Sequence, residues 1–250
     1  MALELHSLEH NIKRDEEFER EVLEHAEPFK PTKTDTLNIN ASTIGGCHRE
    51  AWFARNGYED ERGSRVVHEQ KFVYFMGNAI ERAFFQLLGH IRKMGGKPRI
   101  RDADTGVSGE FDAVIMDVID GKEVPTVVEV KSSHDGRYRK VYDELLMNGI
   151  MPDNHYNQIQ VYLMMEPQFP YCRYVIFNMN MNLKNSMPNF LVFKVFRDDK
   201  KIEELKQWIK DHNEFMKSTT PPHSGDCVPS WKCNAMYCGY KNACKSIDWH

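Results

Sequence analysis

Apolar residues recur along this chain with a helical period at its two ends and with the alternation of strands in its middle. The longest helical pattern spans residues 66–91. Its apolar positions, which share one face, are Phe72, Phe75, Met76, Ile80, Phe84, Leu87 and Leu88. Shorter helices are predicted at 7–27, which is rich in charged helix formers, and at 44–56, which ends before Gly57.

Strand-like runs with many β-branched residues follow at 98–101, 109–118 and 126–132, and we expect them to form a meander of a central sheet. Helices are predicted next at 138–147 and 153–165, then strands at 171–178 and 190–196, and a last helix at 198–216. Pro221 and Pro222 end that helix. The order of elements predicts an α/β or α+β fold with one mixed sheet flanked by helices.

The composition narrows the class of protein. Hydrophobic residues make up 41% and charged residues 28% of the 250 positions, which is typical of one globular core and excludes a low-complexity chain. The net charge of -4 excludes a globally basic nucleic-acid coat, although local patches decide such contacts. Because the sequence shows neither a signal peptide nor an apolar span of about 20 residues, we expect a cytoplasmic protein without a membrane partner.

Charged residues interrupt two of the predicted strands. Glu129 and Lys131 lie two residues apart in a valine-rich run, so alternation places both on one face. Burying a lone charge is costly, so these side chains need each other, a metal ion or solvent. Asp112 interrupts the preceding run, three residues after Gly109. A surface ion pair on an edge strand is the alternative for Glu129 and Lys131.

Two helices carry further candidate residues. Glu81 follows Gly77 by four positions on the long predicted helix, and its alternative is an ordinary solvated residue. Together, the three acids would suit Mg²⁺ or Mn²⁺, which prefer oxygen ligands. Gln158 and Tyr162 lie one helical turn apart, so both project from one face, either toward a ligand or into a packed core.

These residues occur as an ordered series that resembles the motifs of RecB-like PD-(D/E)XK nucleases. The series is Gly77/Glu81, Gly109/Asp112, Glu129/Lys131 and Gln158/Tyr162. The resemblance implies a restriction-endonuclease-like core with Asp112, Glu129 and Lys131 as catalytic residues. It also implies that Mg²⁺ or Mn²⁺ is held by Asp112, Glu129, the backbone carbonyl of Val130 and Glu81. In many members of the family a histidine stands at the position of Glu81.

By the same resemblance, we expect a DNA nuclease, favoured to be an exonuclease on single-stranded ends, that hydrolyses phosphodiester bonds with metal-activated water. The residues expected to bind DNA are Gln158, Tyr162, Arg137, Arg139 and Lys140, although residues 137–140 would also suit a solvated loop. The chain has no GxxxxGK[ST] motif, so a helicase or another recombination or repair partner would open the duplex. The alternative is a catalytically inactive nuclease fold that binds nucleic acid or assists assembly.

Four of the six cysteines lie in the last 24 residues, which suggests metal ligation rather than disulfides in a reducing compartment. One cysteine near the N-terminal helix, Cys47, and three near the C-terminus, Cys233, Cys238 and Cys244, form a pattern that resembles the iron-sulfur subset of the superfamily. This subset includes AddB-type nucleases and CRISPR-associated exonucleases of the Cas-four kind. The resemblance implies a structural [4Fe-4S] cluster that clamps the N- and C-terminal segments together. A Zn²⁺ site is the alternative, and Cys227 is a spare thiol that could substitute for one ligand.

The domain organisation follows from these patterns. Residues 1–40 are expected to form a helical extension, residues 41–222 the nuclease core, and residues 223–250 the cysteine-rich segment.

Overall fold

The computed structural model of the chain describes residues 39–61, 64–89, 93, 98–133, 135–179, 188, 190–223 and 238–247. The helix predicted at 7–27 lies outside these ranges. Most of the other predicted elements appear within two or three residues of their expected positions. None of the helices in the described ranges is both long and apolar enough to cross a membrane.

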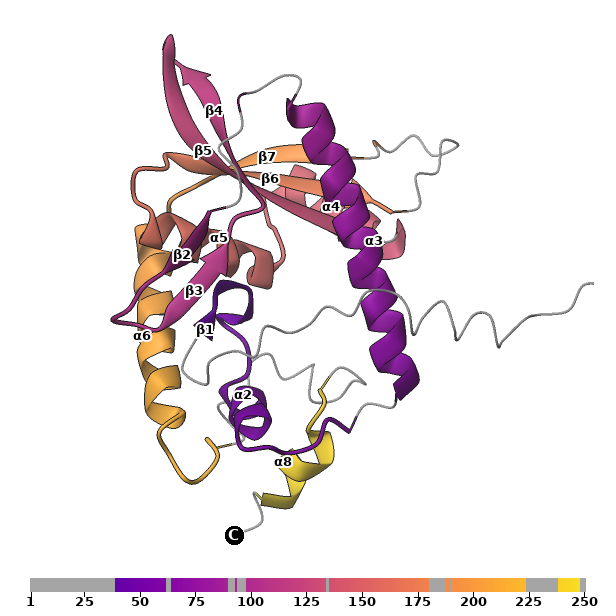
Figure 1. The fold of residues 1–250 in the computed structure, drawn as a ribbon, viewed down its shortest axis with the longest axis vertical. Coiled ribbons are helices and arrows are strands. Elements are labelled where there is room, and N and C mark those ends of the chain that lie inside the picture. The colour runs from indigo at the N-terminus through magenta and orange to yellow at the C-terminus, as the bar shows by residue number, and fades with distance from the viewer. Residues whose placement is uncertain are drawn as a thin grey trace, which may run out of the picture.

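A four-stranded mixed sheet forms the upper part of the molecule in the view of Figure 1. Its strands, in spatial order, are β4 (Ala113–Ile119), β5 (Lys122–Ser133), β6 (Tyr171–Asn178) and β7 (Phe190–Phe196). Strands β5 and β6 run parallel, whereas the two outer pairs are antiparallel. The predicted mixed sheet is therefore confirmed.

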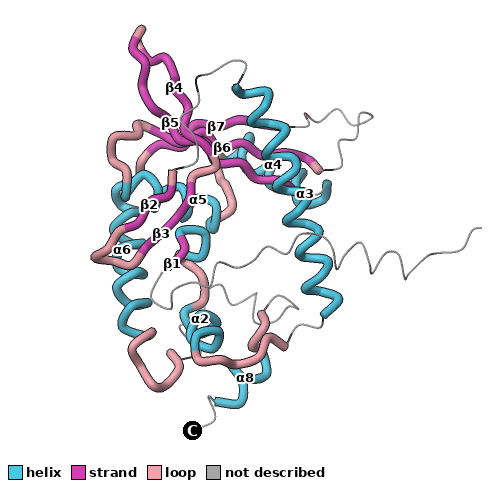
Figure 2. Tube along the Cα trace, in the orientation of Figure 1, coloured by secondary structure: helices cyan, strands magenta, loops and turns pink. Residues whose placement is uncertain are grey.

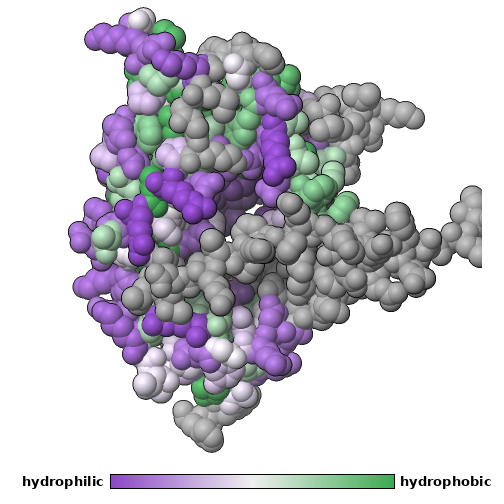
Figure 3. Space-filling model, in the orientation of Figure 1, coloured by the Kyte–Doolittle hydropathy of each residue, from purple (hydrophilic) through white to green (hydrophobic). Residues whose placement is uncertain are grey.

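Strands β4 and β5 are joined by a two-residue turn and project from the body of the molecule (Figure 1). Asp120 and Gly121 both have positive φ angles, of 51° and 76°. This backbone is typical of the turn that matches the twist of paired strands, and Asp-Gly is a preferred sequence for it. The tip of the hairpin carries hydrophilic side chains (Figure 3).

Helices cover both faces of the large sheet. Helix α3 (Ser64–Gly89) packs Phe84 and Leu88 against sheet residues that include Val128, on one face. On the other face lie α4 (Asp135–Asn148) and α5 (Asp153–Met165), and α6 (Asp199–Phe215) packs in turn on α5 (Figure 1). The chain from β5 to β6 runs through α4 and α5, which is the type of helical crossover that parallel strands require.

A second, smaller sheet lies beside the first, and it corrects two predictions. Its spatial order is β1 (Ile39–Asn40), β3 (Val107–Glu110) and β2 (Arg99–Arg101). The single strand predicted at 109–118 was wrong, because β3 and β4 belong to different sheets, and so was the expectation of one sheet. The strand breaks at Phe111, whose buried ring packs against Tyr162 while its N–H bonds to the carbonyl of Pro98.

The base of the molecule joins segments from opposite ends of the described chain. Helix α2 (His48–Arg55) lies beside α8 (Lys241–Ile247), as Figures 1 and 2 show. The helix predicted to begin at residue 44 begins instead at His48, because Ala41–Thr43 forms a separate short turn, η1, and Cys47 acts as the N-cap. The backbone N–H of Glu50 donates a hydrogen bond to the Sγ of Cys47 at 3.4 Å.

Candidate active site

Glu129 and Lys131 lie on the face of β5 that is turned toward α5. Alternation along the strand places them on the same face as Val127, which belongs to the core formed with α5. The carboxylate of Glu129 is only 1% exposed and is paired with the Lys131 ammonium group. Burial by itself would lower the pKa of Lys131, but the carboxylates of Glu129 and Asp112 together raise it above its usual value.

Asp112 occupies the bend where the chain passes from the small sheet to the large one. Its Oδ2 accepts a hydrogen bond from the backbone N–H of Val130 at 2.7 Å, so it lies beside the strand that carries Glu129 and Lys131. Burial, followed by the nearby charges of Glu129 and Glu81, raises the pKa of Asp112 to about 8. The structure therefore brings Asp112, Glu129 and Lys131 into one partly buried site.

Glu81 approaches this site from a different element. It lies on α3, which covers the opposite face of the sheet, and its charge nevertheless contributes to the raised pKa of Asp112. The interaction given by the structure is electrostatic, so direct metal ligation by Glu81 stays a prediction. Three acids and one lysine leave the site with an excess of negative charge, which favours a cation.

The donor set can be compared with the needs of a divalent cation. Within the described ranges, no three His, Cys, Asp or Glu side chains form a complete metal-binding group. Mg²⁺, however, is commonly bound through one or two carboxylates and keeps several of its waters. Asp112, whose carboxylate accepts from the Val130 backbone, and Glu129, the residue before Val130, supply two carboxylates, so these residues fit a hydrated Mg²⁺ or Mn²⁺ ion.

Gln158 and Tyr162 make their contacts inside the protein. Tyr162 is 1% exposed, and its hydroxyl donates to the backbone carbonyl of Glu110 at 3.0 Å. Gln158 Nε2 donates to the same hydroxyl at 2.7 Å. This pair anchors α5 to the end of β3, two residues before Asp112. The assignment of both residues to DNA binding stays a prediction, and their observed contacts are structural.

Gly109 explains how Tyr162 can lie so close to β3. A Cβ atom at Gly109 would lie 2.8 Å from a ring carbon of Tyr162, a distance that real side chains do not adopt. The two hydrogen bonds on its hydroxyl hold the ring in place. The glycine and the tyrosine of the motif series are therefore two halves of one packing contact.

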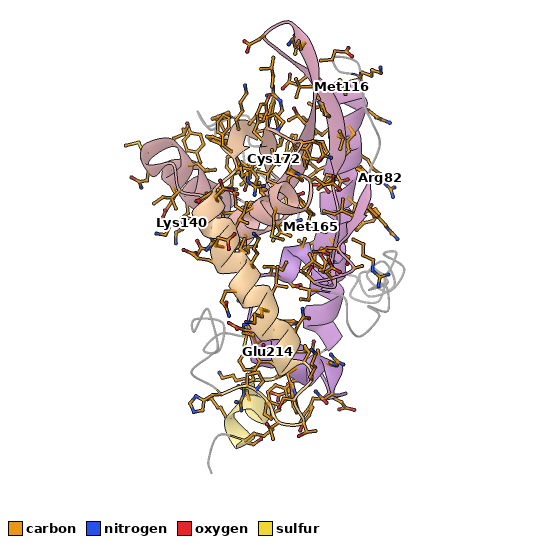
Figure 4. The ribbon with its side chains drawn as sticks, turned by 90° about the vertical axis from the view of Figure 1, so that its left-hand side faces the viewer. Arg82, Met116, Lys140, Met165, Cys172 and Glu214 are labelled. Carbon is orange, nitrogen blue, oxygen red and sulfur yellow. The ribbon has the colours of Figure 1, made fainter. Side chains whose placement is uncertain are left out.

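The basic residues Arg137, Arg139 and Lys140 lie in the first turns of α4, so the alternative of a loop was wrong. Their side chains are exposed, and Lys140 lies at the periphery of the molecule in Figure 4. Arg137 is the one whose charge acts on buried residues near the site, because it helps to lower the pKa of His155. Binding of DNA by these three residues stays a prediction.

Cys172 borders the site although it was not among the predicted site residues. It lies on β6, fully buried in the interior of the molecule (Figure 4), as expected of a small hydrophobic side chain. Burial, followed by the negative charges of Glu129 and Asp112, raises its pKa, so it stays a neutral thiol. Its strand pairs with β5 directly beside Glu129 and Lys131.

Three of the four predicted cluster ligands fall in the described ranges, and Cys233 lies outside them, as does Cys227. Cys47 caps α2, Cys238 precedes α8 and Cys244 lies within α8, and none of the three forms a disulfide. The segments that carry them are held together. Arg49 donates to the carbonyl of Cys244 at 2.8 Å, and the rings of Phe53 and Tyr240 stack 5.9 Å apart.

Comparisons with known proteins support the fold. No protein-family model and no curated protein sequence matches the chain. The chain is similar to a crystal structure described as SSO0001, with 15% identity over 93% of this chain and 96% of that one, and a TM-score of 0.50. At this identity the similarity shows a shared fold, here a mixed sheet flanked by helices.

Two further solved structures are similar at lower TM-scores. LHK-Exo, an alkaline exonuclease from Laribacter hongkongensis solved in complex with dAMP, is 14% identical. The match covers 74% of this chain and 90% of that one, with a TM-score of 0.49. A phage-related exonuclease from Haemophilus somnus 129PT is 16% identical. The match covers 74% of this chain and 97% of that one, with a TM-score of 0.46.

The raised pKa of Asp112 predicts how stability depends on pH in the absence of metal. Between about pH 4 and pH 8 the folded protein keeps a proton on Asp112 that the unfolded chain has released. The free energy of unfolding therefore falls as pH rises through this window, by up to about 1.4 kcal/mol per pH unit from this group. Asp112→Asn should remove that decline and be more stable than the wild type above pH 8.

Urea denaturation in a metal chelator at several pH values measures this effect, and the difference between the two proteins isolates Asp112 from other groups. Asp143→Asn, at an exposed position on α4, is the control and should leave the slope unchanged. Parallel stability curves for the wild type and Asp112→Asn would contradict the burial of this carboxyl.

The two motif glycines should respond differently to alanine. Gly109→Ala forces Tyr162 or β3 to shift, and we expect a loss of about 1–3 kcal/mol in the free energy of unfolding. Gly77→Ala brings a Cβ to 3.4 Å from Ser132 Oγ, an ordinary contact, and alanine suits the interior of α3. Thermal or urea denaturation compares them. Equal destabilisation by both substitutions would show that Gly109 does not have the packing role described above.

Proposed function

We propose that this protein is a metal-dependent DNA nuclease, favoured to be an exonuclease that acts on single-stranded ends. One observation carries the proposal: Asp112, Glu129 and Lys131 lie together where the bend between the sheets meets the buried strand β5. The order of the motifs along the sequence supports it, since these are the residues that the resemblance to RecB-like PD-(D/E)XK nucleases assigns to catalysis.

The proposed chemistry divides between the cation and the side chains. Asp112, Glu129 and the carbonyl of Val130 would hold Mg²⁺ or Mn²⁺, with Glu81 adding negative charge. When bound, the ion supplies Lewis-acid chemistry, which makes water a better nucleophile and offsets charge on the phosphodiester. Lys131 stays protonated because two carboxylates raise its pKa, and it orients the attacking water and contacts the scissile phosphate.

The basic side chains of α4 supply a surface for the nucleic acid. Arg137, Arg139 and Lys140 are exposed on the helix that follows β5 directly, so they lie downstream of the catalytic strand. Side chains of this type bind the phosphate backbone without reading sequence. Opening of a duplex is assigned to a helicase or another repair partner.

The cysteines are proposed to hold a [4Fe-4S] cluster through Cys47, Cys233, Cys238 and Cys244. The support is that α8, which contains Cys244 and begins three residues after Cys238, is fastened to the segment that follows α2. The carboxylate of Glu61 accepts from the backbone N–H groups of Asn242 and Ala243, both at 2.9 Å. Zn²⁺ is the alternative occupant, and Cys227 could replace one ligand.

Substitution of the catalytic pair tests the nuclease proposal. With Mn²⁺ and end-labelled linear DNA, Glu129→Gln and Lys131→Ala should each lower the rate of cleavage by about 100-fold or more, since charge stabilisation in the transition state is lost. Matched controls come from the same strand. Glu123→Gln and Lys122→Ala change the same residue types at the exposed hairpin tip and should cleave like the wild type.

Equal residual degradation by all five proteins would reject the enzyme and favour a nucleic-acid-binding or assembly role for the fold. A circular single-stranded substrate separates the two modes of cleavage, because an exonuclease leaves it intact. Comparison of linear single-stranded and duplex DNA then tests the preference for single strands.

Visible absorption tests the cluster. Protein purified without oxygen should be brown and contain about four irons per chain, and Cys238→Ser should lose the colour and unfold at a lower temperature. A colourless protein with one bound zinc ion would contradict the iron-sulfur assignment.

A further inference from the structure

A hydrogen-bonded pair, His155 and Tyr174, lies beside the Glu129–Lys131 ion pair. His155 Nδ1 lies 2.9 Å from the Tyr174 hydroxyl, and their ring centroids are 5.7 Å apart. We infer that His155 is a positioning residue for the catalytic pair: it holds Tyr174 in place, and through Tyr174 it fixes Glu129 and Lys131. This inference rests on the proposed nuclease function and extends the site to a new residue.

Tyr174 is the neighbour of Glu129 across the sheet. In the parallel pairing of β5 and β6, Glu129 lies opposite Tyr174, and both side chains are buried on the face turned toward α5. Burial, and then the charge of Glu129, raises the pKa of Tyr174, so its hydroxyl stays protonated. A phenol fixed at this position therefore limits the space into which the Glu129 side chain can rotate.

His155 lies in the first turn of α5, where its backbone N–H donates to the carbonyl of Pro152 at 2.9 Å. The positive charges of Lys131 on β5 and Arg137 on α4 act on its ring. Burial, and then these two charges, lowers the pKa of His155 to about 3. The ring is thus neutral at physiological pH, and a neutral ring does not repel the ammonium group of Lys131.

Helix α5 contacts both β3, which precedes Asp112, and β6, which lies beside Glu129. His155, Gln158 and Tyr162 follow one another at spacings of three and four, so they share one face of the helix. Tyr162 bonds to β3 two residues before Asp112, whereas His155 bonds to the strand beside Glu129. One rigid helix therefore sets the separation between the two carboxylates that are proposed to share a metal ion.

Partners that orient a metal ligand or its neighbour usually change affinity or rate by about 10–100-fold when they are removed. We therefore expect His155→Ala to weaken Mn²⁺ binding by about tenfold or more and to lower kcat more than it raises KM for linear DNA. His155→Asn should recover most of both losses, because an amide group can occupy the place of Nδ1 and keep the bond to Tyr174.

The experiment measures Mn²⁺ binding by calorimetry and cleavage kinetics on the full-length protein, with folding of each variant checked by its thermal transition. Tyr174→Phe should reproduce the losses of His155→Ala, and the double variant should lose no more than either single one. Tyr156→Phe is the matched control. It removes a hydroxyl from the adjacent residue of α5, where the bond runs away from the site to Asp198, and should leave binding and kinetics unchanged.

The outcomes separate this inference from the function on which it rests. If the wild type neither binds Mn²⁺ nor cleaves DNA, the nuclease proposal fails. If the wild type does both and Glu129→Gln does not, but His155→Ala matches the wild type, only the role of His155 is rejected. Additive losses in the double variant, or no recovery by His155→Asn, would also reject it, because the effect would then not pass through the bond to Tyr174.

Discussion

The burial of a carboxylate beside Val130 is the constraint on which the arrangement of the core depends. Glu129 sits among apolar neighbours in the middle of the molecule, where an isolated charge would be strongly unfavourable. Lys131 compensates it on one side, while Asp112 is kept close by the backbone N–H of Val130. Asp112 therefore keeps its proton up to about pH 8, and a cation bound at this site would favour its ionised form.

Local patterning was enough to predict most elements, because the period of apolar residues is a property of each segment by itself. The break at Phe111 and Asp112 could not be predicted in this way. It depends on contacts with Pro98 and Tyr162, which are distant in sequence and known only once the chain has folded. The small sheet was missed for a related reason: β1 has only two residues and was not predicted, and the strand predicted at 98–101, which is β2, carries no signal of the sheet to which it belongs.

The site was predictable to the extent that alternation and motif order define it. The spacing of Glu129 and Lys131 predicts that they share one face, the order of the motifs adds Asp112 to them, and the structure has Asp112 beside the same strand. For Tyr162 the sequence left two alternatives, a ligand or the packed core, and it could not decide between them because the packing arises from the fit of the ring against Gly109. The bond from His155 to Tyr174 joins residues that are 19 positions apart and belong to different elements, so no sequence pattern indicated it.

The hydrogen bonds that hold α2 in place also affect when this part of the protein can fold during synthesis. Arg49 donates to the carbonyls of Pro222 and Cys244, which lie 173 and 195 positions further along the chain. Helix α2 thus leaves the ribosome well before the segments that contain these acceptors, and its buried guanidinium group has no such partners until they are synthesised. Contacts of such high sequence separation slow folding and leave early segments exposed. Synthesis of the chain as far as Cys244 is therefore the step that allows the base of the molecule to close.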